Sequence, residues 1–471
     1  MSRVNSTRGE PVRLLGNERT TAIPEGAVMT RERAQEIVQK IVKLSKADEV
    51  QVNLGSSYQS DLRFAANQMS TSGGVLSGGL AVNSTIGKKH AVATTNDLSD
   101  ESLKSVVEKS EALARLSPDD PENMPALPAQ TYLPVNGWFD STANLTAEAR
   151  ARAALTALGP ARKAGDLKAA GFIIVNASSN ALGNNKGLFA YNRSTYSNYT
   201  LTVRTDDGTG SGWVGAEHPD WNQLNFPQLA QRAIEKARLS QNPVAIEPGR
   251  YTVILEPQAV GDLVQLIVGS LAACTADEGR SAFTKQGGGG NKIGEKIVDP
   301  RVTIFSDPED PQLLAQPFDG QGLPLARQVW VENGVLKQLF YSRFWAQKQG
   351  KPVTGGLSSI KMVGGTTSVE DMIKSTARGI LVTRLWYLRQ VDPRTILYTG
   401  LTRDGTFLIE NGKISKSIKN FRFNESPLFL LNNIEAIGPS VRIGGSEGGG
   451  PIVMPAIKAR DFNFTSLSDA V

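Results

Sequence analysis

The stretch Tyr251–Glu256 (YTVILE), followed by Pro257 and by an apolar run from Ala259 to Cys274, decides the fold of this chain. YTVILE is rich in β-branched residues, which predicts a buried strand. Pro257 suits the first position of a helix, where its missing N–H would have no partner. The run that follows is apolar on nearly every side. We therefore predict a buried central helix over residues 257–275.

The sequence beyond this helix alternates between short apolar runs and turn signals. Glu332-Asn333-Gly334 and Glu410-Asn411-Gly412 each place an Asn-Gly pair between two apolar runs. This is the strongest short signal for a β-hairpin. We predict that residues 249–471 form a β-rich domain, in which a large, mainly antiparallel sheet surrounds the buried helix.

The first half of the chain groups its helices and strands in a different order. Residues 1–29 are predicted to be a loose leader, and residues 30–248 an N-terminal α+β region of layered helices and strands. A connector with five prolines near 118–136 divides this region into two possible subdomains. The predicted helices begin at Thr30, Ser99, Thr146 and Phe226, and the predicted strands are 49–54, 60–64, 80–85, 89–94, 171–177, 187–192, 197–205 and 210–215. The predicted fold class is α+β, because helices and strands come in runs rather than in strict alternation.

Charge and cysteine usage limit the classes of partner. The net charge is +5, from 51 Lys and Arg against 46 Asp and Glu. The basic residues are scattered among the acidic ones, which argues against direct binding of nucleic acid. The longest apolar run is too short and too mixed to span a membrane. A lone cysteine and the lack of an apolar leader favour a reducing compartment, and we expect a cytoplasmic protein.

The residues that commonly hold metal ions or act as nucleophiles are scarce. His90 and His218 are the two histidines, and neither has a second ligand at the short spacing that a zinc site requires. Cys274 lies within the apolar run, where a packed thiol is expected. We predict no metal site in this chain. Carboxylates remain as the only plausible acid and base groups.

Several segments of the second half, in this order, resemble the TldD/PmbA family. They are Asp307–Pro311 (DPEDP), Gln316–Pro324 (QPFDGQGLP), Val331–Lys337 (VENGVLK) with Tyr341, Ala377–Trp386 (ARGILVTRLW), Phe407–Ile414 (FLIENGKI) and Asn433–Gly438 (NIEAIG). The resemblance covers roughly residues 30–467, and the glycine-rich hairpins and the helix at Ser99 in the first half fit more weakly. It implies a metallopeptidase-like protein, of a family linked to peptide maturation and to modulation of DNA gyrase, that works in the cytoplasm as a two-subunit assembly.

The same resemblance implies which of the two subunits this chain is similar to. The TldD type carries His-Glu-x-x-x-His on its buried helix and a further cysteine ligand, whereas the PmbA type, also called TldE, lacks them. Here Pro257 and Asp262 stand where the histidines would be, and Gln258 stands in place of the glutamate. Proline offers no ligand atom, and a neutral amide cannot deprotonate a metal-bound water. The chain resembles the second type.

The leading hypothesis is a non-catalytic, PmbA/TldE-like subunit. Its partner would be a TldD-like chain that holds the zinc or iron, and no cofactor is expected in this chain. Its substrates would be unfolded or flexible peptides. Exposed strand edges near 354–365 are expected to pair with the substrate backbone. The candidate substrate-binding residues are Thr354, Gly355, Gly356, Gly364 and Gly365.

Two alternatives remain open. In one, the chain is a homodimer that binds peptides without a metal and without hydrolysing them. In the other, it is a metal-independent hydrolase that uses Glu256, Asp262 or Asp277 as acid and base.

Overall fold

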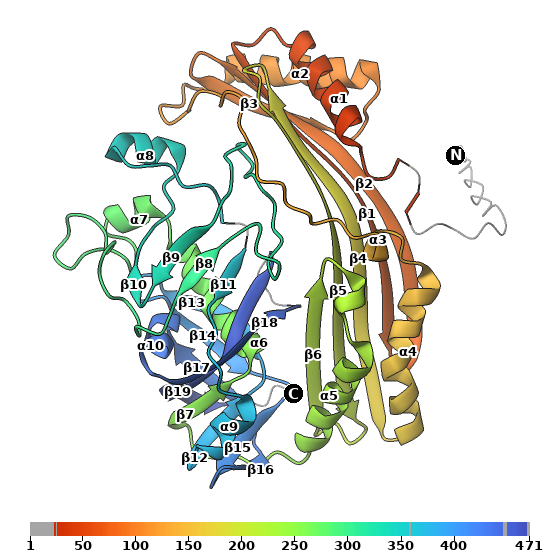
Figure 1. The fold of residues 1–471 in the computed structure, drawn as a ribbon, viewed down its shortest axis with the longest axis vertical. Coiled ribbons are helices and arrows are strands. Elements are labelled where there is room, and N and C mark those ends of the chain that lie inside the picture. Colours follow the sequence, from red (N-terminus) through yellow and green to blue (C-terminus); the bar gives the residue numbers. More distant parts are fainter. Residues whose placement is uncertain (1–22, 25, 358, 446–449, 469–471) are drawn as a thin grey trace, which may run out of the picture.

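The computed structural model describes residues 23–24, 26–357, 359–445 and 450–468. It contains two bodies, each built on its own sheet (Figure 1). Most of the predicted leader, residues 1–22 and 25, lies outside the described part. Of the helices within these ranges, none is long and apolar enough to cross a membrane.

The first body is a six-stranded antiparallel sheet with the order β3-β2-β1-β4-β5-β6. Its strands are β1 (Glu49–Ala65), β2 (Gln68–Ile86), β3 (Lys89–Thr95), β4 (Leu167–Asn184), β5 (Phe189–Thr205) and β6 (Ser211–His218). Its helical segments are α1 (Arg31–Leu44), α2 (Asp100–Leu116), α3 (Asp140–Ala143), α4 (Ala147–Ala164), the short 3-10 helix η1 (Trp221–Gln223) and α5 (Phe226–Leu239).

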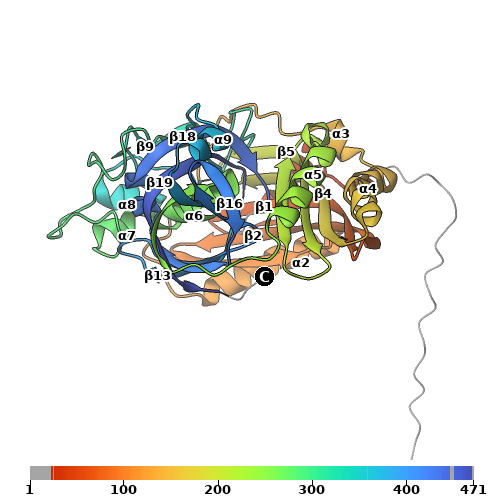
Figure 2. The same ribbon diagram turned by 90° about the horizontal axis from the view of Figure 1, so that it is seen from below.

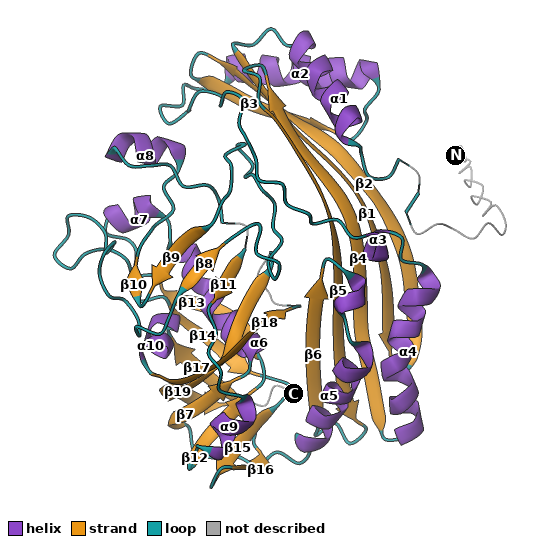
Figure 3. Cartoon of the chain, viewed as in Figure 1, coloured by secondary structure: helices purple, strands orange, loops and turns teal. Residues whose placement is uncertain are grey.

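The helices of the first body begin where their capping residues predict. The hydroxyls of Thr30, Ser99 and Thr146 each accept a hydrogen bond from the backbone N–H three residues later. α1 and α2 cover one end of the sheet, and α4 and α5 cover the other end (Figure 3). The buried face of α2 includes Leu103, Val106 and Val107. Leu113 is 44% exposed, because the buried stripe continues through Ser110 and Ala114 instead.

Two pairs of predicted strands are single long strands. Residues 49–54 and 60–64 both belong to β1. Residues 189–192 and 197–205 both belong to β5, whereas residues 187 and 188 lie before its start. The polar residues between them do not interrupt the strands. Hydrogen bonds to β2 and β4 on the two sides of β1 keep its backbone extended through Gly55–Gln59.

The second body is a 13-stranded sheet, mainly antiparallel, with parallel pairs at β7·β12 and β11·β19. Its strands are β7 (Gly249–Leu255), β8 (Ile304–Ser306), β9 (Gln328–Glu332), β10 (Val335–Leu336), β11 (Ile360–Met362), β12 (Arg378–Val382), β13 (Leu385–Asp392), β14 (Leu397–Thr402), β15 (Thr406–Glu410), β16 (Lys413–Ser417), β17 (Phe421–Glu425), β18 (Ile434–Ile443) and β19 (Ile452–Leu467). Its helical segments are α6 (Pro257–Val264), the 3-10 helix η2 (Gln265–Ser270), α7 (Ala273–Asp277), α8 (Arg343–Gln349), α9 (Val369–Lys374) and α10 (Pro427–Asn432).

Both Asn-Gly hairpins predicted from the sequence are present, as β9–β10 and β15–β16. Asn333 and Asn411 have positive φ angles, as the following glycines do, which is the backbone conformation that tight hairpin turns need. The strands of the second body curve around α6 (Figure 2). The sequence therefore predicted an α+β fold with a mainly antiparallel second sheet correctly.

The predicted helix over 257–275 is not continuous. α6 ends at Val264, a 3-10 segment follows, and Ala272 is extended before α7 begins. The cause is a contact that is distant in sequence. Phe340 N–H donates to the carbonyl of Leu271, and Ala273 N–H donates to the carbonyl of Phe340. This parallel bridge takes backbone groups that a continuous helix would need.

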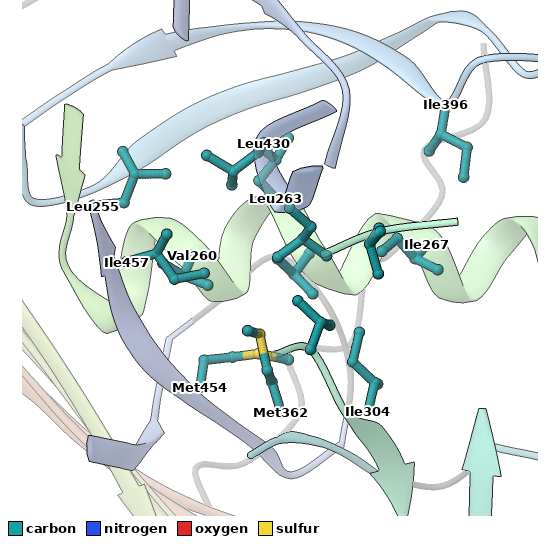
Figure 4. Packing of buried hydrophobic residues seen from close by; sticks show 14 of the residues in the cluster. Leu255, Val260, Leu263, Ile267, Ile304, Met362, Ile396, Leu430, Met454 and Ile457 are labelled. Atoms are coloured by element: carbon teal, nitrogen blue, oxygen red, sulfur yellow. The ribbon is translucent and has the colours of Figure 1, made fainter. Parts of the chain in front are cut away.

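The core of the second body centres on α6. Val260 and Leu263 of α6 and Ile267 of η2 belong to one buried cluster with Met454 and Ile457 of β19 (Figure 4). Gly261 allows the closest approach, because a Cβ there would lie 2.1 Å from Ile443 Cδ1. All seven residues from Gln258 to Val264 are buried.

One buried acid in this body should make its stability depend on pH. Glu425 is 4% exposed, and burial raises the pKa of its carboxyl to about 7. Because the folded protein holds this proton more tightly than the unfolded chain does, the free energy of unfolding should fall as the pH rises from about 4.5 through about 7, by up to about 3 kcal/mol.

Glu425→Gln should flatten this part of the profile, measured by denaturant unfolding across the pH range. Glu370→Gln, at an exposed position, is the control and should keep the wild-type slope. A Glu425→Gln profile that superimposes on the wild-type profile would contradict the prediction.

Candidate functional site

The start of α6 connects the two bodies. Glu256 occupies the N-cap position directly after β7. Its carboxylate lies 2.7 Å from Lys236 Nζ and 3.5 Å from Arg232 Nη2, both on α5 of the first body. Pro257 takes the first helical position, as predicted. The acid at this position therefore joins α6 to the helix layer of the first sheet.

Gln258 and Asp262 lie one turn apart on α6 and bond to each other. Gln258 Nε2 donates to Asp262 Oδ1 over 3.0 Å, and the backbone N–H of Leu385 on β13 donates to Asp262 Oδ2 over 3.2 Å. Gln258 is 8% exposed and Asp262 is 4% exposed. Both oxygens of this carboxylate thus accept hydrogen bonds within the protein, and they attach α6 to β13.

These residues do not fit a zinc or iron ion. Such an ion is usually held by three or four histidine, cysteine or carboxylate ligands. Here Pro257 has no donor atom, Gln258 is a neutral amide, and the carboxylate of Asp262 is already hydrogen-bonded. Across the described residues, no group of three His, Cys, Asp or Glu side chains is arranged to hold a metal ion.

The three carboxylates of the hydrolase alternative have separate sets of partners. Glu256 faces the cations of α5, and Asp262 bonds to Gln258 and β13. Asp277 accepts from Asn291 Nδ2 and from Trp345 Nε1, each over 2.7 Å. Each carboxylate thus has an evident structural role in its own surroundings.

The expected strand edge near 354–365 is not exposed. β11, the strand in this segment, pairs with β8 on one side and with β19 on the other. Both of its edges are therefore taken, which the sequence could not indicate because β19 lies about ninety residues further on.

Of the five candidate substrate-binding residues, three precede β11 in the sequence and two follow it. Thr354 is buried, and its hydroxyl bonds to the backbone of Leu339 and Tyr341. Gly355 and Gly356 pack on the loop that holds Leu325 and Asp319. Gly364 and Gly365 pack closely on β18. All five have structural contacts in this chain, and a role in substrate binding stays a prediction.

The face of the first sheet that is not covered by helices turns toward the second body. Gln51 and Asn53 on this face donate to the carbonyl of Gly320, and Leu182 packs with Phe318. We call this face of β2, β1, β4 and β5 the inner face. It lies between the helix layer and the second body.

The inner face carries rows of uncharged residues that cross four strands. Cross-strand partners point to the same side of a sheet, so the register defines each row. The three central rows are Gly79–Gly55–Asn180–Asn192, Ser77–Ser57–Ser178–Ser194 and Val75–Gln59–Asn176–Tyr196. Hydroxyl and amide groups therefore dominate this part of the inner face, and none of its residues is charged.

A buried ion pair lies at the border of the inner face that β6 forms. Glu217 on β6 lies 3.3 Å from Arg442 Nη2 on β18, and Tyr196 donates its hydroxyl to Glu217. Burial raises the pKa of Glu217, while the positive charge of Arg442 opposes that rise. Arg442 also donates to the carbonyls of Gln312 and Leu313. The second body is thereby held against β6.

Two hollows of very different size lie beside the start of α6 and beside the inner face. The space beside Pro257 and Gln258 measures about 80 Å³, well below the size of an ordinary ligand pocket. Beside the inner face, a hollow of about 550 Å³ is lined by Asn53, Gly79 and the end of β3. Of these two hollows, the larger therefore lies along the sheet and not at the start of α6.

The sequence analysis did not identify the inner face. Its signal was present as alternation, in Gly55-x-Ser57-x-Gln59 and in Asn176-x-Ser178-x-Asn180. Alternation shows that these residues share one side of a strand, but it does not show which strands become neighbours.

Comparison with known proteins identifies relatives. The model of the PmbA/TldA metallopeptidase C-terminal domain matches residues 248–466, and that of the central domain matches residues 141–241. A metalloprotease of Methanothermobacter thermautotrophicus is 27% identical over 257 residues, which are 50% of this chain and 52% of that protein. A Metalloprotease PmbA homolog of Haemophilus influenzae is 22% identical over 404 residues, 81% of this chain and 85% of that protein.

The chain thus spans about half the length of the first curated relatives that it matches. Among solved structures, TldE from Thermococcus kodakarensis has a TM-score of 0.81 and 18% identity, covering 92% of this chain and all of that one. At this identity the likeness concerns the fold alone. The two domain models, which together match more than half of the residues, come from one family, and the chain belongs to the PmbA/TldD metallopeptidase family.

Proposed function

We propose that this chain is the non-catalytic, PmbA/TldE-like subunit of a cytoplasmic two-subunit peptidase. A TldD-like partner supplies the zinc or iron and the catalytic groups. This chain helps to enclose a peptide-binding cavity between the two subunits, and the substrates are flexible peptides. The observation that carries the proposal is the pair Gln258 and Asp262, which bond to each other on the helix where the family's catalytic members hold their metal.

The inner face supports the peptide part of the proposal. Its rows of Ser, Asn, Gln and Gly side chains offer donors and acceptors to an extended backbone without selecting a charge. A folded protein already uses its backbone groups internally, so an unfolded segment has more to gain from such a face. Peptides of varied sequence are the class of substrate that fits.

Co-expression tests the partnership directly. A chain with His-Glu-x-x-x-His on its buried helix should copurify with this one in equal amounts, and the complex should cleave an unstructured peptide such as reduced, denatured casein. The same complex with chelator added should lose activity, whereas this chain alone should have none. Stoichiometric zinc or iron in this chain alone, together with cleavage, would refute the proposal. A persistent homodimer that ignores the partner would favour the peptide-binding alternative.

Asp262 should contribute to stability and not to metal binding. Asp262→Ala leaves the Gln258 amide and the Leu385 N–H without this acceptor in a buried place, and should lower the free energy of unfolding by about 1–3 kcal/mol. Chemical denaturation measures this change. The metal content of the purified chain should stay the same.

A paired variant separates this role from general damage to the core. Gln258→Leu with Asp262→Leu removes the hydrogen-bonded pair together, so it should cost less than the sum of the two single changes to leucine. Glu370→Ala, at an exposed position, is the control and should have little effect. Chelator-insensitive peptidase activity that Asp262→Asn abolishes would instead support the carboxylate hydrolase.

A further inference from the structure

A cavity of about 310 Å³ lies at the end of the inner face where β1 begins. Its lining comes from three parts of the chain. They are the first sheet, the connector between residues 120 and 126, and the start of α8 together with Gln321 of the second body. The volume is within the range of pockets that hold small ligands. The cavity therefore has room for the end of a peptide and not for a folded partner.

Five side chains of the sheet line this cavity from the inner face. Glu49 pairs across the strands with Thr85, and Thr85 pairs with His90, so these three form one row. Gln51 and Asn83 belong to the next row. Cross-strand partners point to the same side of a sheet. The cavity is thus a continuation of the inner face.

One further row, Asn53–Ala81–Thr94, separates the cavity from the three central rows and borders the hollow of about 550 Å³. We call the row Ser77–Ser57–Ser178–Ser194 the serine row. Thr85 lies eight residues from Ser77 on β2. At about 3.4 Å per residue, an extended peptide of about eight residues spans this distance. A peptide on the inner face can therefore reach the cavity with one end.

Two polar side chains of the cavity lack partners within the described part of the chain. Thr85 is 8% exposed, and its hydroxyl bonds to no described residue. Asn83 Oδ1 is buried and likewise has no hydrogen-bond partner among the described residues. A buried acceptor without a donor is unfavourable. Both oxygens are therefore suited to a ligand that donates hydrogen bonds.

Carboxylates outnumber cations in the cavity. Glu49, Asp120 and Glu122 line it, whereas Arg343 is the one Lys or Arg among the described residues of its lining. The backbone N–H of Glu122 donates to Asp120 and holds the pKa of that carboxyl below its usual range. Lys186 lies 3.8 Å from Glu49, but it is exposed and outside the lining. The cavity thus favours a ligand with a positive charge.

A metal ion does not fit this excess of carboxylates. No three His, Cys, Asp or Glu side chains of the described ranges are placed to hold one. His90 Nε2 and Asp120 Oδ2 bond to each other over 3.0 Å, and Glu49 Oε2 accepts the N–H of Ala126 over 2.7 Å. An organic cation that carries N–H donors suits the unpartnered oxygens better.

We propose that the cavity binds the N-terminal ammonium group of a peptide that lies on the inner face. The inference rests on the proposed function, in which this face holds flexible peptides. A primary ammonium has three N–H donors, which can serve the Thr85 hydroxyl and Asn83 Oδ1, while the carboxylates supply the opposite charge. Capture of an amino end is a recurring mode of peptide recognition.

Arg343 distinguishes the amino end of a peptide from its carboxyl end. Its guanidinium donates to the carbonyl of Pro125, and its other N–H groups can donate to the first carbonyl of the peptide. Burial lowers the pKa of Arg343, while the nearby charges of Asp319 and Glu49 oppose that change. A peptide carboxylate at Arg343 would meet the same two negative charges. The amino end therefore fits this cavity better.

The cavity would give a bound peptide a direction without selecting its sequence. The amino end lies at Thr85, and the chain runs along β2 toward the serine row. The side chains of the peptide then face rows that carry no charge. A lysine side chain carries the same ammonium chemistry, so the test has to separate these two sources.

Fluorescence anisotropy of the purified full chain tests the proposal. The probe is a lysine-free peptide of alternating Ala and Ser, labelled at its carboxyl end and long enough to reach from the cavity to the serine row. Acetylation of its amino end should raise the dissociation constant tenfold or more, on the order of 1.4 kcal/mol. An acetylated peptide with lysine as its first residue should bind as weakly as the acetylated probe. Recovery of tight binding by this lysine peptide would overturn the assignment to the N-terminus.

Two variants test the lining of the cavity. Glu49→Gln with Glu122→Gln removes two charges at nearly constant shape and should reduce the preference for the free amino end at least fivefold, on the order of 1 kcal/mol. The matched control is Glu309→Gln with Glu370→Gln, two exposed acids outside the cavity, and it should keep the full preference.

Asn83→Leu with Thr85→Val removes both unpartnered oxygens and should reduce the same preference. Binding of the acetylated probe should stay unchanged in each variant, which shows that the inner face is intact. Equal affinity for the free and acetylated probes, a preference that both cavity variants retain in full, or no binding of the probe would overturn the proposal. Cleavage by the complex with a TldD-like chain is measured separately, so this inference and the proposed function can fail independently.

Discussion

The close packing of α6 against β18 fixes how the two bodies of this protein lie. Gly261 lets the helix approach Ile443 more closely than any other residue would allow. Arg442, directly before Ile443 on β18, forms the buried ion pair with Glu217 of β6. Glu256 at the start of the same helix faces the cations of α5. The position of the first sheet thus follows from the position of one helix, and so does the direction in which its inner face points.

Features set by neighbouring residues could be predicted from the sequence. The strand before Pro257, the capped starts of α1, α2 and α4, and the two Asn-Gly hairpins all depend on residues within one turn of each other. The break at Ala272 could not be predicted, because its cause is Phe340. The same holds for β11, whose pairing with β19 removed the exposed edge expected near residues 354–365. In each failure the deciding contact lies far away in the sequence.

The candidate site also combines features that were visible in the sequence with contacts that were not. The identities of Pro257, Gln258 and Asp262 were visible in the sequence, and they already excluded an ordinary metal site at these positions. That Asp262 accepts the N–H of Leu385 was not visible. This bond gives the carboxylate of Asp262 a structural role, the attachment of α6 to β13. The inner face was even harder to predict, because its rows can be identified only once the register of four strands is known.

Neutrality is the property that the three central rows of the inner face share. On the inner face, uncharged hydroxyls and amides can bond to the backbone of any extended chain, so under the proposed function a peptide is accepted for being unfolded rather than for its sequence. β2 forms one border of these rows, and its Ser77 belongs to the serine row. β2 itself contains no Asp, Glu, Lys or Arg. A charged residue in one of these rows would favour peptides of the opposite charge, so under the proposed function the neutrality of the face keeps the range of accepted peptides wide.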